Sequence, residues 1–222
     1  MKLEIRNLYF SYQDGENRKQ IFDDLSLSFE DGVFYSVTGP SGCGKTTLLS
    51  LIGTLDSPEK GEILLDGQDI FSDPVRYRRE KIGFVFQNYN LIQYMTGIEN
   101  VAMAMDIAGR KIDMHQVLGT LGLIGIDEET AKKRVTRLSG GEQQRIAIAR
   151  AFINNPDIIL ADEATGNLDS ETSENIVSIL SLLAHRFHKC IIMVTHSEEI
   201  AALSDIEYTI INKNVLTIHR NK

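Results

Sequence analysis

The sequence lacks two features that mark secreted and membrane-spanning proteins. It has only two cysteines, Cys43 and Cys190, without paired spacing, so we expect a reducing compartment and a core without disulfides. No apolar run is long enough to cross a bilayer, and the first stretch, MKLEIRNLYF, has no apolar core of the signal-peptide kind. If the protein works at a membrane, we therefore expect another chain to provide the membrane-spanning part.

An excess of basic residues is also missing. The formal net charge is −8, which argues against a dedicated nucleic-acid binder, and we expect no nucleic-acid partner. The 222 residues are enough to bury a sizeable core. No internal repeat and no Pro/Ser-rich linker divides them. We therefore expect one domain, with room for a subdomain.

Hydrophobic patterns predict alternating strands and helices. Apolar strands that alternate with helices indicate a parallel sheet covered on both faces, and the N-terminal strands indicate an added antiparallel part. The turn Asp66-Gly67 predicts a hairpin within Gly61–Ile70. The other predicted strands are Leu3–Asn7, Leu25–Phe29, Val33–Thr38, Asp157–Ala161, Cys190–Thr195 and Glu207–Ile211. One predicted helix begins at Thr46. The others are Glu99–Ala108, Met114–Leu121, Glu142–Phe152 and Glu171–Ala184.

A phosphate-binding loop is predicted where the first buried strand meets a helix. The sequence GPSGCGKT matches G-x-x-x-x-G-K-[ST] in the strand–loop–helix context that the mechanism needs. Backbone N–H groups and the helix N-terminus favour phosphate, Lys45 would reach the β- and γ-phosphates, and Thr46 would offer its hydroxyl to Mg²⁺. Cys43 occupies a free position of the loop, and we expect ATP to protect it from alkylation. The predicted nucleotide-binding residues are Gly39, Pro40, Ser41, Gly42, Cys43, Gly44, Lys45, Thr46 and Thr47.

Acidic residues end a later apolar strand, in DIILADEATGNLDS. A carboxylate at the end of a buried strand beside a phosphate loop is the expected Mg²⁺ partner, which assigns the metal to Asp162. Glu163 is then placed to orient and activate the attacking water. His196 ends the next apolar strand, and if the two strands are neighbours it could reach the γ-phosphate.

The stretch LSGGEQQRIAIARAF places flexible residues at the start of a helix. Capping explains part of this, because Ser139 is a good N-cap and Glu142 completes a capping box. Gly140 and Gly141 need a further reason, such as an anion held close to the helix start.

Taken in order, these motifs resemble the nucleotide-binding subunit of an ABC transporter, over about Leu3 to Asn212. The resemblance implies a P-loop NTPase core formed by residues 1–87 and 153–222, with a helical subdomain inserted at 88–152. It also implies ATP and Mg²⁺ as ligands, and an ATP-sandwich dimer of two copies. In that dimer Ser139, Gly140, Gly141 and Glu142 would face the nucleotide on the phosphate loop of the other copy.

The resemblance assigns further roles at matching positions. Tyr12 matches the aromatic residue that stacks on adenine, although Tyr9 or Phe10 could take that role instead. Gln87 matches the glutamine that senses Mg²⁺ and the attacking water. Asp169 matches the aspartate that couples the two sites of the dimer, and it could also cap the next helix. His196 matches the switch histidine.

Two stretches, EKIGFVFQNYNLIQYMTGIENV and ADEATGNLDS, resemble macrolide-export, lipoprotein-release and bacteriocin-exporter ATPases. This implies a subunit on the cytoplasmic face of the membrane that powers export or extraction through a separate permease. The segment Asn88–Thr96 would form the groove that docks the permease. Ala164 departs from the usual proline after the catalytic glutamate, and we expect an altered rate there without loss of activity.

Other function classes have weaker support in the sequence. A soluble assembly or remodelling ATPase of the iron–sulfur-assembly type is the alternative, because it is also a single unit. A nucleotide switch without hydrolysis would need Glu163 to be idle. A GTPase is disfavoured because no N-K-x-D motif is present.

Overall fold

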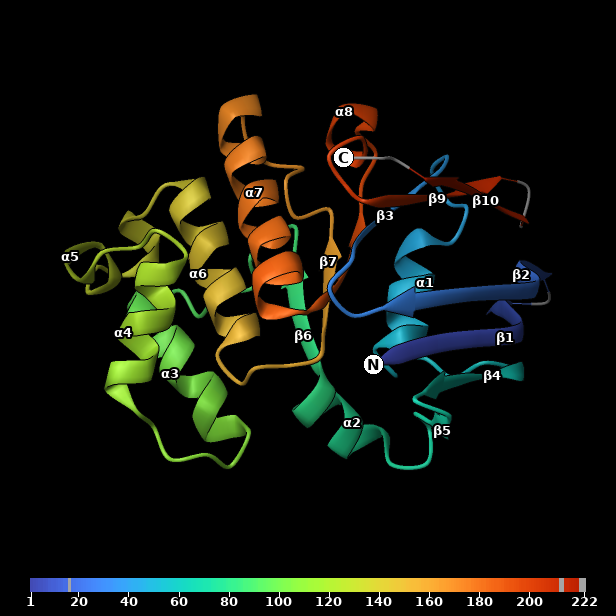
Figure 1. Cartoon of the computed structure of the whole chain (residues 1–222), viewed down its shortest axis with the longest axis horizontal. Coiled ribbons are helices and arrows are strands. Elements are labelled where there is room, and N and C mark those ends of the chain that lie inside the picture. The colour runs from blue at the N-terminus through green and yellow to red at the C-terminus, as the bar shows by residue number, and fades with distance from the viewer. Residues whose placement is uncertain (16, 212–213, 220–222) are drawn as a thin grey trace.

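The computed structural model describes residues 1–15, 17–211 and 214–219, which form two sheets and the helices around them (Figure 1). The larger sheet has six strands in the order β10-β9-β3-β8-β7-β6. All its neighbouring pairs are parallel except β9 with β10. Its strands are β3 (Phe34–Thr38), β6 (Ile82–Phe86), β7 (Ile158–Asp162), β8 (Cys190–Val194), β9 (Ile206–Ile211) and β10 (Asn214–His219).

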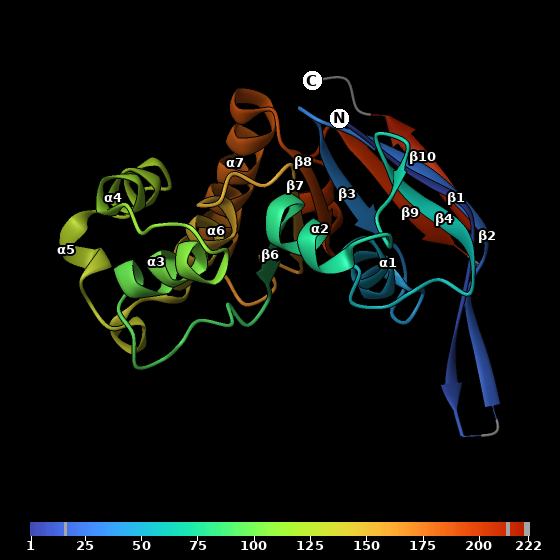
Figure 2. The same cartoon turned by 90° about the horizontal axis from the view of Figure 1, so that it is seen from below.

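The smaller sheet is antiparallel and lies at the other end of the molecule from most of the helices. Its four strands have the order β2-β1-β4-β5. Strands β1 and β2 extend as a long two-stranded ribbon beyond the rest of this sheet (Figure 2). The predicted Asp66-Gly67 turn joins β4 to β5, which confirms the hairpin. The bounds are β1 (Lys2–Asp14), β2 (Asn17–Glu30), β4 (Lys60–Leu65) and β5 (Gln68–Asp69).

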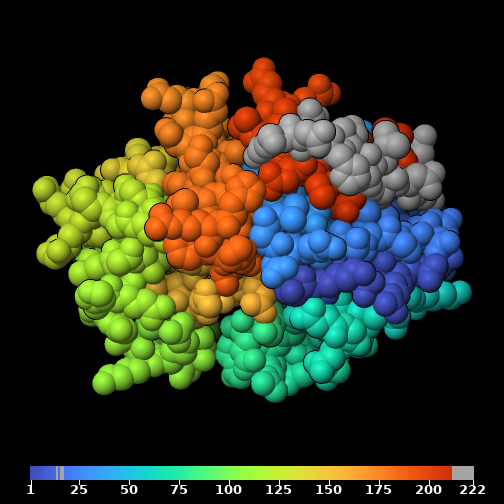
Figure 3. Space-filling model, viewed as in Figure 1, coloured from blue at the N-terminus to red at the C-terminus, as the bar shows by residue number. Residues whose placement is uncertain are grey.

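Helices pack on both faces of the larger sheet, and a helical segment forms one end of the molecule (Figures 1 and 3). In the space-filling view the orange α7 lies between this green and yellow-green end and the blue strands. No helix of the described ranges is both long and apolar enough to span a bilayer. The helices are α1 (Lys45–Ile52), α2 (Pro74–Lys81), α3 (Gly97–Ile107), α4 (Met114–Leu123), α5 (Glu128–Ala131), the 3₁₀ helix η1 (Val135–Arg137), α6 (Gly140–Phe152), α7 (Ser170–Phe187) and α8 (Glu198–Ala201).

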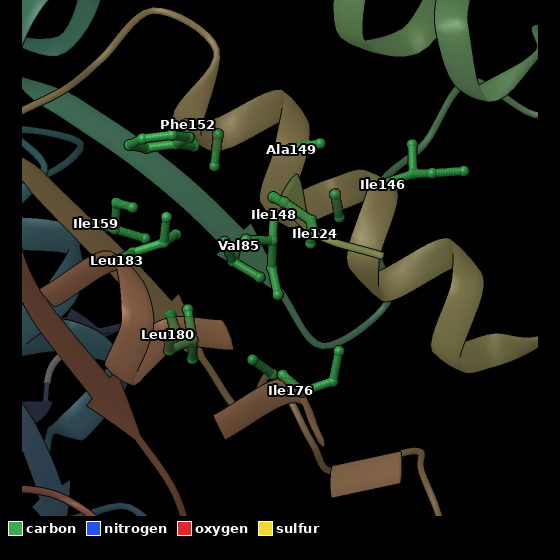
Figure 4. Close-up of a cluster of buried hydrophobic side chains, with 14 of the residues drawn as sticks. Val85, Ile124, Ile146, Ile148, Ala149, Phe152, Ile159, Ile176, Leu180 and Leu183 are labelled. Carbon is green, nitrogen blue, oxygen red and sulfur yellow. The ribbon is translucent and has the colours of Figure 1, made fainter. Parts of the chain in front are cut away.

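Buried apolar side chains form two clusters, one on each side of the parallel sheet. One cluster joins α3, α4, α6 and α7 to the sheet, with Ile148, Phe152 and Leu180 in its centre (Figure 4). The other cluster joins α1 to the antiparallel sheet through residues such as Leu48 and Phe29. Strands β3 and β8 are buried at every position because both of their faces are covered, including Ser36 and Thr38 of β3.

Several elements were not predicted from the sequence: helices α2, α5 and α8, the 3₁₀ helix η1, and strands β6 and β10. Helix α2 carries mostly charged residues and buries only Tyr77, so it has no apolar periodicity to reveal it. Its capping signals were present, because Asp73 accepts a hydrogen bond from the Arg76 N–H and Pro74 begins the helix. Strand β6 follows it at once and pairs with β7 at the edge of the sheet.

Candidate functional site

The predicted phosphate loop connects β3 to α1 and is shaped as an anion-binding turn. Gly44 has φ 107°, and a Cβ there would lie 2.5 Å from Ile21 Cγ2, so only glycine fits. Lys45 is buried, and its Nζ donates to the carbonyl oxygens of Gly39 (2.8 Å) and Pro40 (3.1 Å). The ammonium group is thus held inside the loop, where it would meet a phosphate.

The fold brings Thr46 and Asp162 together, although they are 116 positions apart in the sequence. The Thr46 hydroxyl donates to Asp162 Oδ1 at 3.2 Å, because α1 begins beside the carboxyl end of β7. Burial is the main cause that raises the pKa of Asp162; the hydrogen bond from Thr46 opposes it and the nearby Glu163 charge adds to it. A hydroxyl and a carboxylate at this spacing are oxygen donors of the kind that Mg²⁺ accepts. They therefore fit the predicted metal.

Glu163 and His196 form a close pair. His196 Nε2 lies 2.7 Å from Glu163 Oε1, since β7 and β8 are neighbours and each residue follows the end of its strand. The Glu163 N–H donates to the Val194 carbonyl at 3.1 Å, and the Gly166 N–H donates back to the Glu163 carbonyl at 2.9 Å. Glu163 has φ 48°, so these bonds hold a turn that few residues adopt. Ala164, which replaces the usual proline, is buried in the core next to this turn.

Tyr12 reaches the same place from the antiparallel sheet. Its hydroxyl lies 3.4 Å from Thr47 Oγ1 and 3.4 Å from Asp56 Oδ2, and its ring packs edge-on against Phe10 at 4.9 Å. Tyr12 remains 42% exposed, whereas Phe10 is buried and Tyr9 lies beside Lys60. Of the three candidate aromatics, Tyr12 is the one that lines the cavity at the phosphate loop.

That cavity has a volume of about 340 Å³ and joins residues from five separate stretches of the chain. Two of its residues, Lys19 and Ile21 on β2, were not predicted, because no motif marks this strand. The complete lining is Tyr12, Lys19, Ile21, Ser41, Gly42, Gly44, Lys45, Thr46, Thr47, Glu163 and His196.

Gln87 follows the end of β6, whose last residue pairs with Asp162. Its side chain lies against Gly166, where an added Cβ would be 2.8 Å from Gln87 Nε2. Within the described residues it makes no hydrogen bond to Thr46 or Asp162. Gln87 is therefore near the turn that begins at Glu163 but is not hydrogen-bonded to the predicted metal ligands.

Ser139, Gly140, Gly141 and Glu142, called the signature from here on, lie at the start of α6. Ser139 and Glu142 form the expected capping box. Ser139 Oγ accepts from the Glu142 N–H at 3.3 Å, and Glu142 Oε2 accepts from the Ser139 N–H at 2.7 Å. The hydrogen bond from the Ser139 N–H, aided by one from the Ser139 hydroxyl, lowers the pKa of the Glu142 carboxyl. None of these residues lines the cavity at the phosphate loop. The predicted nucleotide-binding residues of one chain are thus in two separate places.

Both signature glycines are closely packed within the chain. A Cβ on Gly140 would lie 2.8 Å from the Tyr89 hydroxyl, and one on Gly141 would lie 2.6 Å from Thr172 Cγ2. Thr172 is in turn bonded to Asp169, which caps α7 by accepting from the Thr172 N–H (2.9 Å) and hydroxyl (2.8 Å). The capping role that was expected of Asp169 is confirmed, and it places the start of α7 against the start of α6.

The predicted docking segment is only partly at the surface. Leu91 is buried in the core and Tyr89 packs against it, which leaves Tyr94 exposed at 74%. Leu91 lies within the segment Asn88–Thr96 that was expected to dock the permease, but because it is buried it offers no surface to a partner. A groove of about 550 Å³ lies nearby, with Val75 and Ile107 exposed in it. It is lined by Val75, Arg78, Arg79, Ile82, Gly83, Phe84, Phe86, Asn90, Ala104, Ile107, Ala108, Arg150, Ala151 and Asn154.

Comparison with known proteins identifies the family. Residues 22–166 match the family described as ABC transporter. The chain is 38% identical over 216 residues to the lipoprotein-releasing system ATP-binding protein LolD of Shewanella frigidimarina, which covers 93% of this chain and 89% of LolD. It is 43% identical over 209 residues to the macrolide export ATP-binding/permease protein MacB of Aggregatibacter actinomycetemcomitans, which covers 90% of this chain but 32% of MacB.

A solved structure agrees with the sequence comparison. The dimeric post-hydrolysis state of the Methanocaldococcus jannaschii ATP-binding cassette MJ0796, bound to ADP and Pi, superposes with a TM-score of 0.88. The match has 35% sequence identity and covers 99% of this chain and 100% of that one. The predicted P-loop NTPase fold, with its parallel sheet, antiparallel β part and helices, is therefore confirmed. The chain belongs to the ABC transporter family, as an ATP-binding and ATP-hydrolysing subunit.

Proposed function

We propose that this subunit powers the export or extraction of a peptide, a lipoprotein or a drug-like molecule through a separate membrane permease. The observation that carries the proposal is the division of the site within one chain. The phosphate loop, Glu163 and His196 share one cavity, and the signature at the start of α6 does not reach it. A second copy is needed to bring a signature to each cavity, and the MJ0796 cassette is a dimer.

Nucleotide binding is assigned to the cavity described above. The backbone of residues 39–47 and Lys45 hold the phosphates, and Tyr12 provides its exposed ring face for adenine. Thr46 and Asp162 would hold Mg²⁺, and Gln87 would be a further ligand. When bound, the metal neutralises charge on the phosphates.

Hydrolysis is assigned to the Glu163–His196 pair. Glu163 accepts a proton from the water whose oxygen attacks the γ-phosphorus. The bond from that phosphorus to the bridging oxygen breaks, and ADP and inorganic phosphate leave. His196 orients the Glu163 carboxylate through the 2.7 Å contact and faces the γ-phosphate.

ATP binding would drive dimerisation because the nucleotide is part of the interface. Ser139, Gly140, Gly141 and Glu142 present the N-terminus of α6 to the γ-phosphate of the partner. Asp169 couples the two sites, since the α7 turn that it caps touches Gly141 through Thr172. In this division residues 88–152 act as the helical subdomain, and 1–87 with 153–222 act as the core.

The permease would dock in the groove between α2, β6 and α3. Exposed Val75 and Ile107 offer apolar contact, and Arg78, Arg79 and Arg150 give the groove positive charge. MacB, an ATP-binding/permease protein, supports a permease partner. The subunit would thus sit at the cytoplasmic face of the membrane.

The experiment is a pull-down with tagged Glu163→Gln in ATP and Mg²⁺, from detergent-solubilised membranes of the native host. Glu163→Gln should bind ATP, stall hydrolysis and trap the dimer, with a polytopic permease at about two ATPase copies per complex. Lys45→Ala is the control, because it should lose productive ATP binding and dimerisation. A soluble partner without any membrane protein would instead indicate an assembly ATPase.

A further inference from the structure

Lys19 is a second lysine at the phosphate loop, and it comes from outside the loop. It lies on β2, directly opposite Tyr12 on β1. Directly opposed residues of an antiparallel pair point to the same face, so the lysine and the tyrosine leave the ribbon side by side. Both line the cavity with Gly42 and Lys45.

The Lys19 ammonium group lies beside the phosphate loop. A Cβ built on Gly42 would be 3.8 Å from Lys19 Nζ, with no other heavy atom of the described residues within 4 Å of it outside Gly42 and its chain neighbours. The Lys19 side chain therefore reaches from Tyr12, which would stack on adenine, to the loop that would hold the phosphates. A nucleotide bound between them would pass the ammonium group.

The charge of Lys19 has no partner among the described residues, in contrast to its neighbours. Arg18, the preceding residue, pairs with Glu59. Lys45 is bonded to the Gly39 and Pro40 carbonyls. An unpaired cation at the mouth of an anion-binding cavity is unusual in a chain of net charge −8, because acidic partners are plentiful elsewhere on its surface.

We propose that Lys19 contacts a phosphate of the bound nucleotide and provides part of the affinity for nucleoside polyphosphates. The inference rests on the proposed nucleotide site. Because Lys19 is exposed, its contribution should weaken as salt concentration rises. It should matter more for ATP than for AMP, since the triphosphate carries more charge close to Gly42.

The test compares Lys19→Met, Lys19→Arg and the matched control Arg18→Met. Methionine keeps an unbranched apolar side chain but removes the charge, and Arg18 is on the same strand with its charge already paired. Dissociation constants for ATP and AMP are measured without Mg²⁺, at about 50 mM and 300 mM salt, and unfolding temperatures verify folding. Without the metal, no turnover complicates the binding curves.

Lys19→Met should weaken ATP binding by roughly threefold to tenfold at low salt, and by less at high salt. AMP binding should change little, and Lys19→Arg and Arg18→Met should bind ATP like the wild type. ATP should also protect Lys19 from amine acylation, as measured by mass spectrometry. Unchanged ATP affinity in Lys19→Met, or equal acylation with and without ATP, would overturn the inference.

Lys45→Ala separates this inference from the proposed site. If Lys45→Ala loses ATP binding while Lys19→Met does not, the nucleotide site stands and only the role of Lys19 is wrong. If Lys45→Ala binds ATP like the wild type, the proposed site itself is wrong.

Discussion

Gly141→Ala tests why the signature helix begins with glycines. The added Cβ would lie 2.6 Å from Thr172 Cγ2, whereas carbon atoms in contact normally stay about 3.5–4.0 Å apart. The start of α6 or of α7 must therefore move by roughly 1 Å. Overpacking of this kind costs about 1–3 kcal/mol, and each kcal/mol lowers Tm by about 2–4 °C in a chain of this size.

Thr172→Ser provides a rescue that follows from the same contact. Serine lacks Cγ2 but keeps the hydroxyl that donates to Asp169 at 2.8 Å. In the double variant the next closest atoms to the new Cβ lie at 3.8–3.9 Å, which is ordinary contact. Gly141→Ala with Thr172→Ser should therefore recover most of the lost Tm.

The assay measures Tm, ATP affinity and the rate of hydrolysis for the two single variants and the double variant. ATP affinity of the monomer should stay at the wild-type level throughout, because Gly141 does not line the cavity. Hydrolysis by Gly141→Ala should fall by up to about a hundredfold, the effect expected of a 1 Å displacement. If the double variant regains Tm but not hydrolysis, the glycine is also needed for the phosphate of the partner.

Gly119→Ala is the matched control, because Gly119 lies within α4 with open space around its Cβ position. It should stabilise the fold by about 0.5–1 kcal/mol, since alanine favours a helix. The packing argument fails if Gly141→Ala has the Tm of the wild type, or if Thr172→Ser brings no recovery.

Three further predictions concern the same site. Alkylation of Cys43 should block ATP binding and ATP should slow the alkylation, with buried Cys190 as the unreactive control; equal rates with and without ATP would contradict this. Tyr12→Ala should weaken ATP binding about tenfold, for a stacking loss of roughly 1–3 kcal/mol, while Tyr12→Phe keeps the ring and should bind normally. Unchanged affinity in Tyr12→Ala would assign stacking to another residue. Because the pKa of Glu142 is lowered in the folded chain, its carboxylate stabilises the fold above the unfolded pKa and this contribution is lost as pH falls through the folded pKa. Glu142→Gln should thus lower Tm at pH 7, and this deficit should shrink as pH falls through the folded pKa of Glu142; a deficit that does not change with pH would refute it.

Much of the site could be predicted because its chemistry is written in short contiguous motifs. The strand before Gly39 and the apolar run before Asp162 were both expected to be buried strands, and both are. Their parallel order in one sheet brings Thr46 to Asp162 and His196 to Glu163. The capping box at Ser139 was likewise visible as a local spacing.

The remainder depends on contacts between distant residues that no local pattern records. Lys19 is at the loop only because the β1–β2 register places it opposite Tyr12. Leu91 follows a polar turn and looks like part of an exposed aromatic segment, but it is buried in the hydrophobic cluster of the helices. Glycine is favoured at position 141 because Thr172, on the next helix, packs against it. Each of these depends on register or packing, which a single sequence does not contain.

The cavity at the phosphate loop and the signature are separate because they are anchored in different hydrophobic clusters. Helix α1 and the phosphate loop are anchored in the cluster that includes Leu48, whereas α6 is anchored in the cluster that includes Ile148. The turn from Glu163 to Asp169 connects them, because it pairs with His196 at one end and caps α7 beside Gly141 at the other. A change at the γ-phosphate that moves Glu163 therefore acts on the same short turn that supports the signature helix.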